Sequence, residues 1–281
     1  MIYVKGVKLL GAKTSKAERR GTIVLERIRA RYERFVRVQF TRILKRTYQA
    51  FIDLDHIPDT VEIFAIIQST HDAQKDVLAR MYRAIYPEAS ALTTPDEDIK
   101  SMDGLLFKDR AETETYLLEQ WMADNIGTMI RNLDAEDITQ DLWYIDDTTV
   151  KEIRKAIAEA NGNVDIFQER VQHIMGSSEY RAYRIARTET ARASNVAMHI
   201  SAEVYSFDRP LNKVWITVGG STVRATHRVM DGTVIPKDDM FLVPNRLGGY
   251  DMMQYPLDGA HGASAGNVVN CRCHCAYRYA D

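Results

Sequence analysis

Apolar side chains recur at intervals of three and four residues along the first fifty positions, and this period predicts one amphipathic helix from Ser15 to Phe51. Its apolar face comprises Leu25, Ile28, Tyr32, Val36, Phe40 and Ile43. At about 100° per residue, a row of basic side chains falls on nearly the opposite face. This basic stripe consists of Arg20, Arg27, Arg31, Arg34 and Lys45. Pro58 follows, and we expect it to stop the helix.

Similar periodicity predicts further helices along the chain. We expect them over residues 60–86, 111–133, 149–160, 164–175 and 178–205. Pro87 should close the first of these, because a proline inside a helix removes a hydrogen bond and clashes with the preceding turn. Pro95 and several aspartates predict a loop over residues 88–109. Asn161-Gly162 is typical of a helix end.

The pattern changes after residue 206. Lys213–Val218 reads as a strand, Gly219-Gly220 as a turn, and residues 268–279 as a final strand. The sequence therefore predicts an α+β fold, with an elongated helical body and a small mixed α+β C-terminal domain. The expected domains are a basic amphipathic helix over residues 1–58, a helical body over 59–206, and an α+β domain with a Cys/His cluster over 207–281.

Composition and charge narrow the class of protein. Of the 281 residues, 45% are hydrophobic and 27% charged, which is typical of a soluble globular protein. No apolar run approaches the roughly 20 residues of a membrane span, and the N-terminus lacks a signal-peptide core, so we expect synthesis in a cytoplasm. The net charge of −2 conceals a basic segment, residues 1–50 with a net of +11, and an acidic segment, residues 51–147 with a net of −15. Such segregation suggests charged surfaces that meet different partners, or each other.

The cysteines suggest a metal site. Three cysteines within five residues do not form a disulfide framework, whereas four-coordinate zinc prefers Cys and His ligands. His227 and His261 are the nearby histidine candidates, and Cys271 and Cys273 could share one ion with His227, the fourth ligand being unassigned. On a regular strand Cys271, Cys273 and Cys275 would line one face, with the outer pair roughly 13 Å apart and thus too distant to share an ion. The alternative is that these cysteines are buried apolar residues of a core strand. Zinc is thus a candidate cofactor.

A catalytic role has less support in the sequence. His227 and Asp231 are four residues apart and could share a helical face, and Ser221 or Cys273 could serve as a nucleophile. No G-x-S-x-G nucleophile elbow accompanies them. We therefore expect no catalytic residues and no enzymatic activity.

The helix over residues 178–205 carries a charged motif. Glu189 can pair with Arg192 one turn on, and Arg184, Arg187 and Arg192 can act as hydrogen-bonded anchors against the C-terminal domain. The alternative is an ordinary solvated helix face.

Taken in order over residues 184–275, a set of residues resembles the phage Mu F-like head morphogenesis family. The set comprises Arg187, Glu189, Arg192, Asn195, Trp215, Arg224, His227, Asp231, Gly232, Asn270, Cys271, Arg272 and Cys273. Two departures are Gly219-Gly220-Ser221 where an acidic residue is expected, and Met230 where a leucine is usual.

The resemblance implies a minor capsid protein that associates with the portal during procapsid assembly. Its expected partners are the portal protein and the major capsid or scaffolding protein. It would lie in the host cytoplasm during assembly and then in the virion, inside the head near the portal. Some relatives are linked to DNA entry into the host.

The basic stripe leaves three interpretations open. It could contact phosphates of double-stranded DNA, dock on an acidic portal or capsid surface, or face the acidic segment or solvent. The competing function classes are a metal-dependent enzyme and a non-viral DNA-binding protein.

Overall fold

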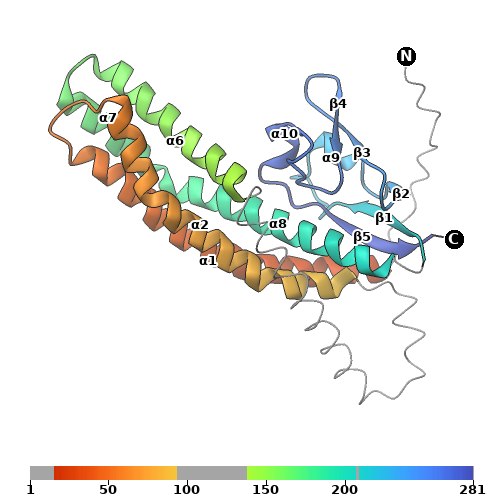
Figure 1. Ribbon diagram of the computed structural model, residues 1–281. Helices are drawn as coiled ribbons and strands as arrows, with labels where there is room; N and C mark the ends of the chain where they lie inside the picture. Colours follow the sequence, from red (N-terminus) through yellow and green to blue (C-terminus); the bar gives the residue numbers. More distant parts are fainter. Residues whose placement is uncertain (1–15, 94–137, 207–208, 281) are drawn as a thin grey trace. The chain divides into compact units, whose positions relative to one another are not determined.

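The computed structural model describes residues 16–93, 138–206 and 209–280 of the chain. The predicted α+β class is confirmed, because long helices precede two small antiparallel sheets (Figure 1). The long helices are α1 (Lys16–Ile52), α2 (Thr60–Ser90), α6 (Ile138–Ala160), α7 (Val164–Gly176) and α8 (Ser178–Tyr205). In the described parts of the chain, no helix is both long enough and apolar enough to cross a membrane.

Contacts group the chain into two compact units. Within the described residues, unit 1 comprises residues 16–30, 85–93, 190–206 and 209–280, and unit 2 comprises residues 31–84 and 138–189. The boundaries between the units fall inside α1, α2 and α8. The division into domains over 1–58, 59–206 and 207–281 stays a prediction.

Helix α1 agrees with its predicted range to within one residue at each end. Its predicted apolar face is largely buried, with Val36 and Phe40 fully so. Helix α2 then begins with a reciprocal cap, in which the Asp59 carboxylate accepts from the Glu62 N–H at 2.9 Å and Glu62 accepts from the Asp59 N–H at 3.0 Å. The Pro58-Asp59 sequence thus separates the first two helices.

Unit 2 contains a polar network that joins α1, α6 and α8. Arg181 donates to Glu152 at 2.9 Å, to Thr149 at 2.9 Å and to the Ile145 carbonyl at 2.6 Å. The Tyr48 hydroxyl contacts both Arg181 and Glu152. Burial raises the pKa of Tyr48, so this phenol remains a neutral hydrogen-bonding group.

Two predicted helix limits are wrong. Pro87 lies inside α2, which continues to Ser90. The residues beyond the proline are held by tertiary bonds within unit 1, since Ser90 donates to the Ala197 carbonyl and Thr93 to the Met198 carbonyl. Helix α6 begins at Ile138, eleven residues before the predicted start. The predicted helix over 111–133, and the loop from residue 94 onward, lie outside the described residues.

The limits of α7 and α8 agree with the sequence. Asn161 and Gly162 end α6 with positive φ angles of 47° and 82°. Asn163 then caps α7, its side chain accepting the N–H of Ile166 at 3.1 Å.

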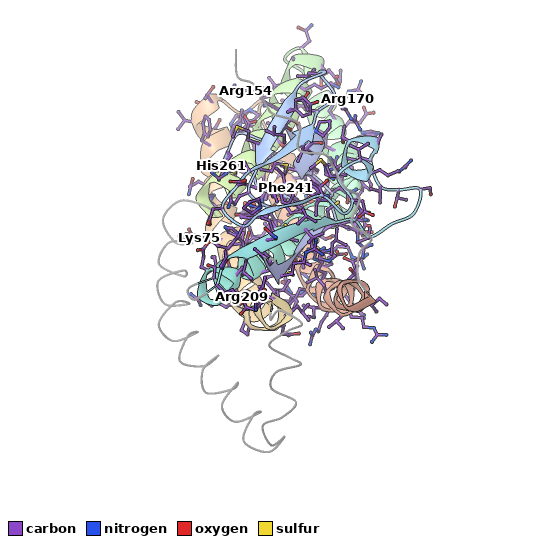
Figure 2. All side chains as sticks on the ribbon, turned by 90° about the vertical axis from the view of Figure 1, so that its right-hand side faces the viewer. Lys75, Arg154, Arg170, Arg209, Phe241 and His261 are labelled. Carbon is purple, nitrogen blue, oxygen red and sulfur yellow. The ribbon has the colours of Figure 1, made fainter. Side chains whose placement is uncertain are left out.

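A three-stranded antiparallel sheet forms the core of the C-terminal part of unit 1. Its order is β2 (Val234–Pro236), β1 (Leu211–Ile216), β5 (His274–Tyr279), and a separate hairpin consists of β3 (Phe241–Pro244) and β4 (Tyr250–Met253). On β1, Trp215 is fully buried and packs edge-on against Phe241, labelled in Figure 2, with ring centroids 5.1 Å apart. Two short helices, α9 (Ala225–Arg228) and α10 (Ala265–Val268), interrupt the strands.

Both predicted strands differ in their limits. β1 starts and ends two residues earlier than predicted. It ends at Ile216 because the N–H of Thr217 donates to the Asp231 carboxylate at 2.7 Å and not to a neighbouring strand. β5 starts only at His274, because α10 occupies residues 265–268 and Asn270 turns the chain with a φ of 61°. The Gly219-Gly220 turn is confirmed, both residues having positive φ.

Candidate metal centre

His227, Cys271 and Cys273 meet in the interior of unit 1. His227 lies on α9, and the two cysteines lie in the segment that precedes β5. The Nδ1 atom of His227 is 3.4 Å from Cys271 Sγ and 3.5 Å from Cys273 Sγ. All three ligand atoms lie within 4.8 Å of one another, and the residues are only 1–3% exposed. Folding thus brings the histidine to two cysteines that lie 44 and more positions away in the sequence.

These distances suit a tetrahedral ion. With Zn–S near 2.3 Å and Zn–N near 2.0–2.1 Å, tetrahedral angles place the nitrogen and a sulfur roughly 3.5 Å apart. The two observed separations of 3.4 and 3.5 Å agree with that value. The donor set of one imidazole and two thiols is also one that zinc prefers.

A hydrogen-bond chain fixes the orientation of the His227 ring. The side-chain amide of Asn267 donates hydrogen bonds to the Pro244 carbonyl at 3.0 Å and to the Asp251 carboxylate at 2.9 Å, both of which can only accept. The Asn267 carbonyl oxygen must therefore face His227 Nε2, 3.2 Å away, and accept a hydrogen bond from the Nε2–H group. A neutral His227 then presents the lone pair of Nδ1 to the two sulfurs, which is the tautomer a metal ligand requires.

Asp251 anchors this chain. One of its carboxylate oxygens accepts from the Ser264 N–H at 2.9 Å and hydroxyl at 2.6 Å as well as from Asn267, and the other accepts from Asn245 at 2.9 Å. Burial opposes ionisation of Asp251, but these hydrogen bonds prevail and lower its pKa. An ionised carboxylate therefore orients Asn267, and Asn267 in turn orients the histidine.

The two clustered thiols differ in acidity. Burial alone would raise the pKa of Cys271, but hydrogen bonds from the Cys273 thiol and backbone N–H bring it well below its usual range. The same contact raises the pKa of Cys273, because a thiolate on Cys271 disfavours a second charge beside it. The Trp215 indole lies close enough to Cys273 to partly oppose that rise. Cys271 is therefore the more acidic of the two thiols.

Cys275 stands apart from this cluster. It lies on β5 opposite Trp215 of β1, and burial raises its pKa to about 12. The prediction that all three cysteines line one face of a regular strand is wrong, because Cys271 and Cys273 precede β5 and reach His227 from irregular backbone.

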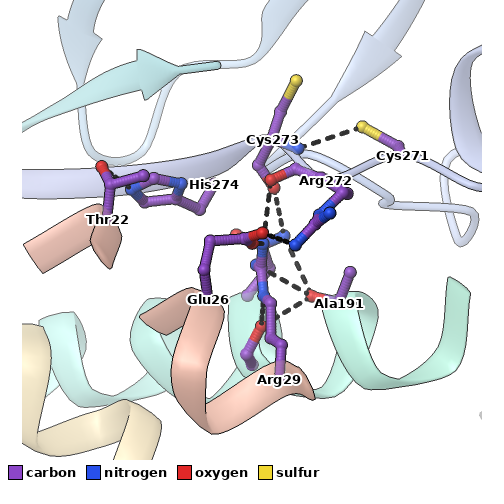
Figure 3. A network of polar contacts seen from close by, with 10 residues as sticks. Thr22, Glu26, Arg29, Ala191, Cys271, Arg272, Cys273 and His274 are labelled. Atoms are coloured by element: carbon purple, nitrogen blue, oxygen red, sulfur yellow. Dashed lines mark hydrogen bonds and ion pairs between the residues drawn. The ribbon is translucent and has the colours of Figure 1, made fainter. Parts of the chain in front are cut away.

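Arg29 of α1 holds the segment that carries the cysteines (Figure 3). Its guanidinium is fully buried and donates to the Arg272 carbonyl at 2.8 Å and to the Ser194 hydroxyl at 2.8 Å. Glu26, one turn earlier on α1, forms an ion pair with the Arg272 side chain. Asn195 of α8 donates to the Cys273 carbonyl at 3.0 Å. The segment 270–273 is therefore bound by two helices through its backbone as well as its side chains.

Other motif residues shape the backbone around the cluster. Arg224 donates to the Val269 carbonyl, just before the cysteine segment. Asp231 accepts from the Thr217 N–H and hydroxyl and does not share a helical face with His227, since α9 ends at Arg228. Gly232 has a φ of 79° and donates its N–H to the Trp215 carbonyl at 2.8 Å.

The charged motif on α8 is partly an anchor. Arg192 is half-buried and donates to the Leu257 carbonyl of the C-terminal part of unit 1 at 3.4 Å. Arg187 instead contacts Tyr183 on its own helix, and Arg184 lies over the Tyr180 ring. Glu189 is buried, and its pairing with Arg192 stays a prediction.

The basic stripe is exposed where its side chains are described. Arg27, Arg31, Arg34 and Lys45 are all exposed on α1, and Lys45 pairs with Glu179 at 3.3 Å. Arg20 lies on α1, but its side chain is outside the described set.

Three residues that support the site carry weaker signals in the sequence. Arg29 interrupts an apolar face four residues after Leu25 and next to Ile28, and a charge at such a position can indicate a buried, paired group. Asn267 and Asp251 carry no local pattern, because their role depends on contacts with residues that are distant in the sequence.

Comparison with known proteins agrees with the residues that the sequence singled out. Residues 147–276 match a protein family model described as Phage Mu protein F like protein. The match runs from α6 into β5 and contains every motif residue from Arg187 to Cys273. No curated protein and no solved structure matches the chain.

Proposed function

Since residues 147–276 of this chain match the family model described as Phage Mu protein F like protein, we propose that the protein is a minor capsid protein that binds the portal inside the procapsid and assists assembly. In general terms it is a phage head morphogenesis protein, and the family match is the observation that carries this. The portal as partner, and a final position inside the head near the portal, are the finer parts of the proposal. The proposal includes no enzymatic reaction, because the Cys/His cluster is too buried to receive a substrate.

The basic stripe of α1 is the surface that we propose for docking. Helical periodicity places Arg27, Arg31, Arg34 and Lys45 within an arc of roughly 60°. Opposite charge on a partner would steer association and set the register of the complex.

Exposed apolar residues on α1 favour a protein partner for this surface. Ile23 is 55% exposed and Val38 is 38% exposed, and helical periodicity places both within about 40° of Arg27. Protein interfaces combine arginine with apolar and aromatic side chains, whereas DNA backbone contacts use cations and polar groups. The interleaving of apolar and basic positions therefore supports docking on an acidic protein surface.

The first experiment is co-expression of the protein with the neighbouring portal and major capsid proteins, followed by mass spectrometry of purified procapsids. We expect the chain at low, reproducible copy number and its loss when the portal is omitted. Absence from particles that otherwise assemble would overturn the proposal.

A charge-reversal pair tests the surface itself. Changing Arg27, Arg31 and Arg34 to Glu should abolish retention by immobilised portal. A control with the same change in net charge converts Arg83, Arg154 and Arg246 to Glu, all exposed and none of them on α1, and should bind normally. Equal loss in both variants would show that only net charge matters.

Contact with packaged DNA is the second candidate for the same stripe. If the three arginines each contact a phosphate of double-stranded DNA, their reversal should change the slope of a plot of log affinity against log salt concentration. The slope should become shallower by about three. Val38→Ser separates the two partners, because it should weaken portal binding and leave DNA affinity unchanged. DNA affinity that is insensitive to the three arginine changes would remove this candidate.

A further inference from the structure

We propose that Nδ1 of His227 and the sulfurs of Cys271 and Cys273 bind one Zn²⁺ ion, and that this ion organises the backbone on which the start of α1 is seated. The proposal concerns unit 1 alone and does not depend on which partner the protein meets in the head. The ligand atoms are the three that already face one another.

A hydrogen bond between thiol and imidazole accounts less well for this geometry than an ion does. The single lone pair of Nδ1 can accept a proton from one thiol only, yet both sulfurs stand at nearly equal distances of 3.4 and 3.5 Å. One ion bound by all three atoms would explain both distances at once. The Cys273 N–H also points to Cys271 Sγ at 3.4 Å, as expected for a donor that supports a metal-bound thiolate.

The surroundings of the ligands have the properties of an outer coordination shell. The Asp251–Asn267–His227 chain holds the imidazole in the required tautomer, and such outer partners usually strengthen metal binding. Zinc usually takes four ligands, so a water molecule or another group would complete the set. The 1–3% exposure of the three ligands points to a structural ion, because a catalytic one needs access for its substrate.

The ion would act on α1 through two carbonyl groups. Arg29 of α1 donates to the Arg272 carbonyl, and Asn195 of α8 donates to the Cys273 carbonyl. Both carbonyls belong to the segment that the two cysteine ligands would fix. Metal binding would therefore set the position of the acceptors that the two helices require, and its loss would release residues 21–30 first.

The test uses the full-length chain purified under reducing conditions. Elemental analysis should find one equivalent of zinc per chain, and Co²⁺ in its place should show charge-transfer absorption from cysteine thiolates. His227→Ala, Cys271→Ser and Cys273→Ser should each remove the bound metal. Cys275→Ser is the matched control, since this thiol is equally buried and two residues away but outside the triangle, and it should keep the full equivalent.

A second set of measurements keeps the test valid if a ligand variant fails to fold. Asn267→Ala leaves all three ligands in place and should weaken zinc affinity roughly 10–100-fold, as outer-shell changes do. Chelation of zinc from the unaltered protein should increase hydrogen exchange at residues 21–30 and 270–273, and added Zn²⁺ should restore protection. A folded wild-type chain that takes up no zinc or cobalt, or equal metal loss in Cys275→Ser and Cys273→Ser, would overturn the proposal.

Discussion

Replacement of Arg29 by methionine should be among the most damaging single changes in unit 1. Methionine preserves much of the length and packing of the side chain but removes every hydrogen-bond donor. The guanidinium is fully buried and makes two bonds of 2.8 Å, to Ser194 and to the Arg272 carbonyl, with longer contacts of 3.3 Å to the Glu26 carboxylate and 3.4 Å to the Ala191 carbonyl. Removal would take this donor from the Arg272 carbonyl and the Ser194 hydroxyl, whereas the Ala191 carbonyl would still accept from Ser194 and Asn195.

The cost can be estimated from these contacts. A hydrogen bond that involves a charged group contributes about 1.5–3 kcal/mol, so the two short bonds account for roughly 3–6 kcal/mol. Relief of the desolvation of a buried cation offsets part of this loss. We expect a decrease of about 3–5 kcal/mol in the free energy of unfolding. That is a large share of the roughly 5–15 kcal/mol that a typical domain possesses.

Urea unfolding followed by circular dichroism and tryptophan fluorescence measures this change. Arg27→Met is the matched control, because Arg27 lies two residues away on the exposed face of the same helix, and it should stay within about 0.5 kcal/mol of the wild type. A double-mutant cycle with Ser194→Ala should give a coupling energy of roughly 0.5–3 kcal/mol.

Two outcomes would contradict this prediction. A loss below about 1 kcal/mol for Arg29→Met, equal to that of Arg27→Met, would mean that the network adds no net stability. A coupling energy of zero with Ser194 would mean that the 2.8 Å hydrogen bond from Arg29 to Ser194 does not contribute to the free energy of unfolding.

Three further predictions concern single positions. Burial lowers the pKa of His199 from 6.5 to about 4, so between these pH values the folded chain binds fewer protons than the unfolded chain. The free energy of unfolding should therefore fall by up to about 1.4 kcal/mol for each pH unit of acidification from 6.5 to 4. His199→Gln should flatten this slope in acid titrations followed by circular dichroism. Gly232→Ala should lower the thermal midpoint, with a cost of about 1–2 kcal/mol, because the residue has a φ of 79°; an unchanged midpoint would exclude backbone strain there. Asn163→Ala should cost about 1 kcal/mol through loss of the α7 cap, whereas Asn163→Asp should retain most of it, as urea midpoints would show.

The helices could be predicted wherever a local rule was decisive. The period of apolar residues identified α1 to within a residue, and the Asn161-Gly162 pair separated α6 from α7 through positive φ angles that these residue types tolerate. Pro87 is an instance in which such a rule fails. Its ring disfavours a helix interior, yet bonds from Ser90 and Thr93 to α8 hold the chain helical beyond it.

The candidate site was predictable in its members but not in its geometry. Residue chemistry selected Cys271, Cys273 and a histidine, with His227 and His261 both available, because zinc prefers thiols and imidazole. The folded structure brings His227 to the two cysteines. The strand geometry that accompanied this choice was wrong, since β5 begins after Cys273. Whether an ion occupies the triangle stays a prediction.

The long helices, the small sheet region and the ordered motif from Arg187 to Cys273 could all be identified before folding was considered, because helical period, turn residues and family-specific spacing are local properties of the chain. The folded structure was needed to find that Arg29 anchors the segment that carries the cysteines, and that Asn267 sets the tautomer of His227. The physical reason is that burial and hydrogen-bond partnership are properties of the folded chain. The orientation and charge state of a side chain depend on its neighbours in space, and for Arg29 one of these neighbours, Arg272, is 243 residues away in the sequence.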